Sequence, residues 1–108
     1  MPQQHYAAVA KTLLAEPGVT LGAPGKRGFG SGALQVNHKI FAMLSSQGRF
    51  VVKLPRVRVD ALVANGSGDR FDPGHGRLMK EWFVAGAGAD WLQLAHEALR
   101  YVAAKAAP

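Results

Sequence analysis

Apolar residues recur at helical spacing in three segments of the chain. In residues 3–15 they return every three to four positions, which predicts an amphipathic helix ended by a Glu-Pro-Gly sequence. A second helix is expected from Pro55 to the Asn65-Gly66 pair, and a third after Asp90, whose carboxylate suits a helix cap. The expected apolar faces consist of Tyr6, Val9, Ala10, Leu13 and Leu14, then Val59, Leu62 and Val63, then Trp91, Leu92, Ala95, Ala98, Leu99 and Val102.

Elsewhere the apolar pattern changes to short runs of strand character, separated by turn sequences. Short turns, such as Asn37-His38, join the first strands and favour antiparallel pairing. The Gly-rich residues 66–69 predict a further turn, and residues 17–32 a loop. The expected strands are residues 33–36, 40–44, 49–54 and 79–84, with a short fifth strand at 19–21 inside the loop.

This order of elements predicts an α+β fold. We expect an N-terminal helix, an antiparallel sheet of about four to five strands interrupted by a helix, and a C-terminal helix packed on the sheet. A chain of 108 residues has the length of one domain, so residues 1–108 are predicted to form a single domain.

The sequence FDPGHGRLMKEW, residues 71–82, allows two interpretations. Asp72 and His75 lie three positions apart across a Pro-Gly pair, and with Lys80 they would form the start of a ligand or catalytic site. A turn that feeds the strand beginning at Met79 explains the same residues, because Asp, Pro and Gly are typical turn formers. We expect the turn, and keep the small ligand site as the alternative hypothesis.

The remaining composition offers little for catalysis. The absence of cysteine excludes a disulfide framework, a thiol nucleophile and cysteine-type zinc sites. The four histidines lack metal-ligand spacing, and the seven acidic residues are spread singly. No serine stands in a nucleophile-elbow sequence. The prediction is a non-enzymatic domain without catalytic residues, metal or cofactor.

Charge points to a different class of partner. Thirteen Lys and Arg residues oppose seven Asp and Glu residues, which gives a net charge of +6 that attracts polyanions. The cations are scattered and form no basic tail, so weak DNA binding through phosphates, without sequence reading, is the leading hypothesis. The residues predicted to contact phosphates are Lys26, Arg27, Lys53, Arg56, Arg58, Arg77 and Lys80.

Aromatic residues support a second hypothesis, a homodimer or other protein-interaction module without nucleic-acid binding. Phe29, Phe50 and Trp82 are its candidate contact residues. Trp82 and Phe83 are adjacent in a strand, so they must point to opposite faces of the sheet. Trp82 beside Lys80 on an exposed face would suit nucleic acid, but we expect Trp82 to pack under the last helix.

The N-terminal sequence lacks the basic and apolar regions of a signal peptide, and no apolar run is long enough to span a membrane. A cytoplasmic location without membrane contact is therefore expected.

Three stretches together resemble a known family: KRGFGSGALQVNHKIFAML, GRFVVKLPRVRVDALVANGSGDRFDPGHGRLMKEW and DWLQLAHEALRYV. Their order, over residues 26–102, is similar to the TfoX N-terminal domain and MmcQ/YjbR group of small bacterial proteins. The most specific parts are residues 71–82 and 39–44. The resemblance implies an α+β fold with a central antiparallel sheet flanked by helices, and an association with DNA binding. It implies no catalytic residues.

Overall fold

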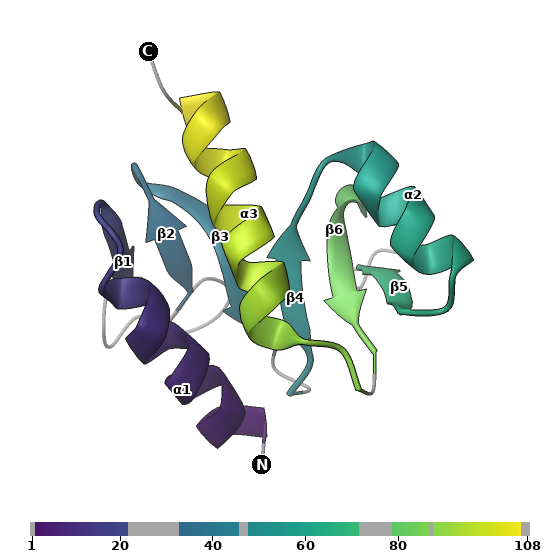
Figure 1. The fold of residues 1–108 in the computed structure, drawn as a ribbon, viewed down its shortest axis with the longest axis horizontal. Helices are drawn as coiled ribbons and strands as arrows, with labels where there is room; N and C mark the ends of the chain where they lie inside the picture. Colours follow the sequence, from purple (N-terminus) through teal and green to yellow (C-terminus); the bar gives the residue numbers. More distant parts are fainter. Residues whose placement is uncertain (1, 22–32, 46–47, 72–78, 87, 107–108) are drawn as a thin grey trace.

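The computed structural model describes residues 2–21, 33–45, 48–71, 79–86 and 88–106 (Figure 1). This part of the chain contains three helices and one sheet. The helices are α1 (Pro2–Leu14), α2 (Arg56–Ala64) and α3 (Trp91–Ala106). The strands are β1 (Val19–Leu21), β2 (Leu34–Val36), β3 (Lys39–Leu44), β4 (Phe50–Lys53), β5 (Gly68–Phe71) and β6 (Met79–Ala85).

The six strands form one sheet in the order β1-β2-β3-β4-β6-β5, and every neighbouring pair is antiparallel. The predicted α+β fold is confirmed, with one strand more than expected. The additional strand is β5, in a segment whose glycines predicted a turn. Position 68 in β5 requires a glycine, because the backbone of β6 lies too close for any side chain. An added Cβ would lie 2.1 Å from the carbonyl oxygen of Val84.

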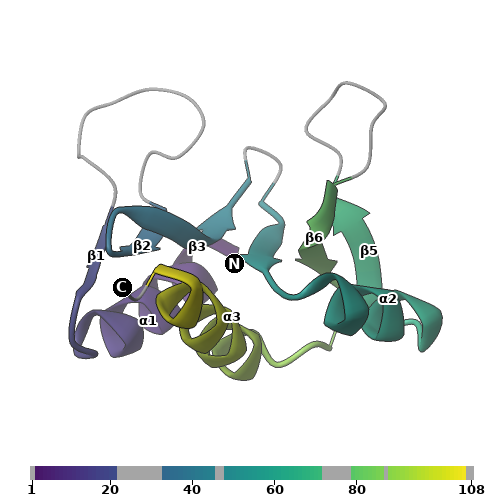
Figure 2. The same cartoon turned by 90° about the horizontal axis from the view of Figure 1, so that it is seen from above.

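All three helices lie on one face of the sheet, as Figure 2 shows. Helix α3 packs on β2, β3 and β4, α1 packs on α3 and β1, and α2 packs on β5 and β6. The main core lies between these helices and the sheet, and burial of its apolar surface is the chief stabilising contribution. Its largest fully buried side chains include Phe41, Phe50, Phe83, Leu13 and Leu54.

The turn between β2 and β3 was predicted correctly. Asn37 and His38 both have positive φ angles, 52° and 66°, as a two-residue type I′ hairpin turn requires. Strand β3 then contains a bulge, since Gln35 pairs with Ile40 and Leu34 pairs with Ala42. Phe41 is the additional residue. The bulge lets Phe41 and Ala42 both join the helix-side core, which explains the unbroken apolar sequence here.

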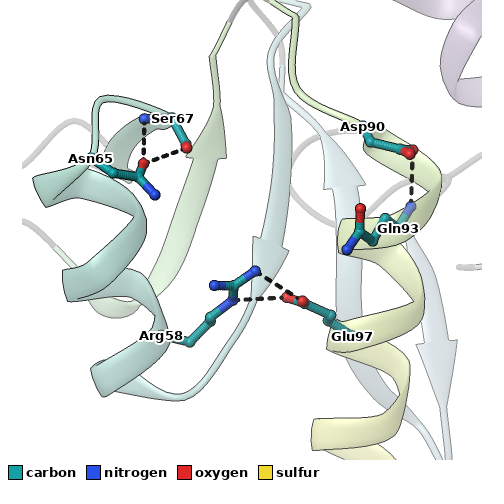
Figure 3. A network of polar contacts seen from close by, with 6 residues as sticks. All are labelled: Arg58, Asn65, Ser67, Asp90, Gln93 and Glu97. Carbon is teal, nitrogen blue, oxygen red and sulfur yellow. Dashed lines mark hydrogen bonds and ion pairs between the residues drawn. The ribbon is translucent and has the colours of Figure 1, made fainter.

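The ends of the helices follow the predicted signals. A carboxylate oxygen of Asp90 accepts a hydrogen bond of 3.1 Å from the backbone N–H of Gln93, which confirms the cap of α3 (Figure 3). After α2, the side-chain oxygen of Asn65 accepts hydrogen bonds from the backbone N–H and the hydroxyl of Ser67. These contacts lead the chain directly from α2 into β5.

An ion pair connects α2 with α3. The guanidinium of Arg58 donates two hydrogen bonds to Glu97, of 3.2 Å from Nε and 3.0 Å from an Nη, and Figure 3 shows the two side chains bridging the helices. The side chain of Glu97 is 22% exposed and that of Arg58 is 42% exposed. Solvent therefore screens the pair only in part.

We expect the Arg58–Glu97 pair to contribute about 1 kcal/mol to the free energy of unfolding, the upper end for exposed pairs, because its geometry is bidentate. A double-mutant cycle with Arg58→Gln and Glu97→Gln, followed by urea unfolding, measures this coupling energy. The Arg56 and Asp60 pair in α2, 3.9 Å apart and more exposed, is the matched comparison and should give less. Equal coupling energies in the two cycles would contradict the expectation.

Candidate nucleic-acid interface

Three lysines lie at the same end of the sheet, on the three adjacent strands β3, β4 and β6. Both neighbours of β4 run antiparallel to it, so β3 and β6 begin where β4 ends. Lys39 opens β3, Lys53 closes β4 and Lys80 is the second residue of β6. We call Lys39, Lys53 and Lys80 the lysine end. At the usual spacing of strands its backbone spans about 10 Å. Lys39 pairs with Val36 of the main core and points to the helix side, whereas Lys53 pairs with Trp82 and points to the other side, so the lysine end is an edge that both faces of the sheet share.

The three lysines differ in how free their charges are. Lys39 and Lys80 are exposed, and among the residues that the structure describes neither has an ion-pair partner. Lys53 is half-buried, and its ammonium lies 4.0 Å from a carboxylate oxygen of Glu81 and 5.5 Å from the ring centroid of Trp82. Lys39 and Lys80 can therefore bind phosphate without breaking an ion pair, whereas the charge of Lys53 is already partly compensated by Glu81.

The two arginines predicted from α2 have unequal roles. The chain passes from β4 through Pro55 directly into α2, so Arg56 also lies near the lysine end. Its side chain is 65% exposed, and its contact with Asp60 is long. Asp60 also accepts a hydrogen bond from Arg70, which compensates its charge further. Arg56 is thus available to a ligand, while Arg58 is held by Glu97.

Three other predicted phosphate contacts lie outside the described residues, so the structure does not test them: Lys26, Arg27 and Arg77. The same holds for Asp72 and His75, the core of the alternative ligand site, and for Phe29. Lys39 was missed by sequence reasoning. The signal was present, because Lys39 directly precedes the predicted strand 40–44, and the next predicted strand carries Lys53.

Trp82 and Phe83 lie on opposite faces of the sheet, as predicted. Their cross-strand partners are Lys53 and Val52, respectively. Phe83 is fully buried in the core under the helices. The expectation that Trp82 would pack under the last helix is wrong, because the register that sends Phe83 and Val52 towards the helices sends Trp82 to the other side. Phe50 is likewise wrong as an exposed contact residue, since it is fully buried.

The face of the sheet away from the helices carries a small apolar cluster of its own. We call it the second face. In the part of the chain that the structure describes, no helix packs on it (Figure 2). Ile40, Phe71 and Trp82 are half-buried there. The buried residues beneath them are Ala33, Met43, Val51 and Val84.

A hollow lies at the end of the sheet opposite the lysine end. Its volume is about 490 Å³, and its lining includes His5, Arg49, Phe50 and Trp91. The indole of Trp91 is stacked between the rings of His5 and Phe50, at centroid distances of 3.9 and 4.7 Å. Both faces of Trp91 are therefore occupied by the protein, and the hollow offers no free aromatic face of this indole to a ligand.

The tyrosine beside this stack does not titrate in the physiological range. Burial raises the pKa of Tyr6 to about 12, and a backbone hydrogen bond with Leu34 opposes the shift only in part. Across the described ranges, no three histidine or acidic side chains lie close enough together to hold a metal ion. The lysine end with the second face remains the best-formed arrangement of charge and aromatic surface.

None of the described helices combines the length and the apolar character needed to cross a membrane. Comparisons with models of protein families, with curated proteins and with solved structures find no match to this chain. The resemblance to the TfoX N-terminal domain and MmcQ/YjbR group therefore stays a prediction, based on the residues quoted above.

Proposed function

We propose that this chain is a non-enzymatic domain that binds nucleic acid weakly, through phosphate contacts at the lysine end. The observation that carries the proposal is the arrangement of Lys39, Lys53 and Lys80 on three adjacent strands, with Arg56 beside them. An ammonium group is a point charge that recognises phosphate without fixed geometry. Such contacts supply affinity and carry no sequence information, so the domain should bind DNA of any sequence.

The overall charge supports the same proposal. A net charge of +6 raises the local concentration of a polyanion and speeds its approach. Of the predicted contacts that the structure describes, Arg58 is expected to contribute least, because its two hydrogen bonds to Glu97 would have to break before it could bind phosphate. Lys39 takes its place in the proposed set.

Charge reversal tests the proposal. Lys80→Glu, and separately Lys39→Glu, should weaken binding of a labelled DNA about tenfold at about 50 mM salt, and should lower the slope of log K against log salt by about 1. Fluorescence anisotropy at several salt concentrations measures both quantities. The matched control is Arg49→Glu, which changes the net charge equally but stands before β4, at the opposite end of the sheet.

The control variant should bind nearly as well as the unmodified protein. An equal loss of affinity in all three variants would mean that only the overall charge matters. If the unmodified protein retains no DNA at about 50 mM salt, the proposal fails.

One observation favours the homodimer as the second candidate. Ile40 and Trp82 leave part of the second face apolar and accessible, and a second copy of the chain would cover it. Light scattering at two protein concentrations distinguishes the two candidates. A strict monomer would exclude the homodimer and would not affect the proposal of DNA binding.

A further inference from the structure

Trp82, on the second face, lies near two cations, Lys53 and Lys80. Lys53 is its direct partner across the β4–β6 pair, and Lys80 precedes it by two positions on the same strand. The backbone N–H of Leu54 donates a hydrogen bond of 2.9 Å to the carbonyl of Glu81, so β4 and β6 stay joined as far as Glu81. On its other side β6 is bulged, because Arg70 pairs with Phe83 whereas Phe71 pairs with Met79. Lys53 and Trp82 therefore share one surface, and Lys80 lies on the bulged part of β6 beside it.

The indole of Trp82 is well supported. Val51 and Val84 are buried beneath the half-buried ring, and the Lys53 ammonium lies over the ring, 5.5 Å from its centroid, from where this flexible side chain can move to a phosphate when a base stacks. Packing of this kind limits the movement of the indole, so little conformational entropy is lost when a ligand stacks on it. The carboxylate of Glu81, 4.0 Å from the Lys53 ammonium, partly compensates the charge of Lys53.

We propose that the second face binds single-stranded nucleic acid, with a base stacked on Trp82 and the flanking phosphates at Lys53 and Lys80. This inference rests on the proposed function and names its substrate class. An aromatic ring beside cations, on a sheet face that none of the described helices covers, suits an unpaired strand, whose bases are free to stack on protein. In a duplex the bases are stacked on one another, so a duplex can offer this surface only its phosphates.

Charge favours a nucleic-acid strand over a second copy of the chain on this surface. A symmetric dimer through the second face would place the same patch on both sides of the interface. Lys53 of each copy would then approach the cations of the other copy, and like charges in an interface oppose association. A polyanion meets the same cations with complementary charge.

The binding experiment uses the two tryptophans of the chain, Trp82 and Trp91. Trp91→Phe removes the indole that lies outside the second face and keeps an aromatic ring in the stack with Phe50, so the remaining fluorescence reports on Trp82 alone. The probes are oligothymidylate of about 10 nucleotides, a duplex of equal length, and inorganic polyphosphate, which has no bases. We expect oligothymidylate to quench Trp82 and to bind about tenfold more tightly than the duplex. Polyphosphate should bind without quenching.

The second variant is Trp82→Leu, which removes the stacking surface and keeps an apolar side chain over Val51 and Val84. It should lose about tenfold in affinity for oligothymidylate and almost none for the duplex. Trp82→Phe keeps a ring and should retain most of the preference. Thermal unfolding of each variant establishes that the protein used is folded.

The outcomes separate the two proposals. Equal binding of both DNAs without quenching, unchanged in Trp82→Leu, would overturn the single-strand inference and leave phosphate binding intact. Failure of both DNAs and of polyphosphate to bind would overturn the proposed function together with the inference.

Discussion

Replacement of Gly68 by alanine is expected to destabilise the domain by about 3 kcal/mol or more. The new Cβ would lie 2.1 Å from the carbonyl oxygen of Val84, 2.6 Å from Cζ of Phe83 and 2.9 Å from the backbone nitrogen of Gly86. Two of these three atoms belong to the backbone and cannot move aside as a flexible side chain would. Strand β5 must therefore separate from β6, and the contact of α2 with both strands weakens with it.

Urea unfolding of Gly68→Ala beside Gly66→Ala tests this expectation. Gly66 has a φ of +83° and nothing within 4 Å of an added Cβ, so its replacement should cost only the backbone strain of about 1–2 kcal/mol. If the two variants unfold at the same urea concentration, the close approach of β5 to β6 is not a determinant of stability.

The second large effect is expected for Phe83, where truncation to alanine should cost about 3–5 kcal/mol. Phe83 is fully buried between the sheet and the helices, so its loss leaves a cavity in the main core. Its neighbour Trp82 is larger but only half-buried on the second face, and Trp82→Ala should cost about 1–2 kcal/mol.

Chemical unfolding of both variants measures the contrast between the two faces. Equal losses would contradict the division of the protein into a main core and a smaller second face. The comparison also supports the binding experiments, because a variant at Trp82 that stays folded can be assayed for nucleic acid.

Much of the fold could be predicted because its signals are local. The turn residues Asn37 and His38 and the cap at Asp90 each depend on a few neighbouring positions, and the structure confirms them. The apolar stripe predicted for α3 is confirmed except at Leu92, which is exposed, while Leu94 is buried in the main core instead. Strand β5 could not be predicted in this way. Its sequence, Gly-Asp-Arg-Phe, has no alternation of apolar and polar residues, and it is a strand because β6 lies beside it.

The candidate site shows the same limit more clearly. The alternation of a strand predicts that Trp82 and Phe83 face opposite ways, but the choice between the faces depends on the register with β4. Arg58 could be identified as a cation from the sequence, yet its partner Glu97 is 39 residues away. Which charges are free is therefore a property of the tertiary structure.

The position of β6 between β4 and β5 has a consequence for the order of folding. Helix α2 and strands β5 and β6 follow one another along the chain and contact one another, whereas the pairing of β4 with β6 closes a loop around α2 and β5. Short-range contacts form at a smaller entropic cost than long-range ones. The α2–β5–β6 unit is thus expected to assemble before it docks on β4. If Arg58 and Glu97 meet only on docking, we expect their ion pair to slow unfolding without accelerating folding, which the unfolding and refolding rates of Arg58→Gln would measure.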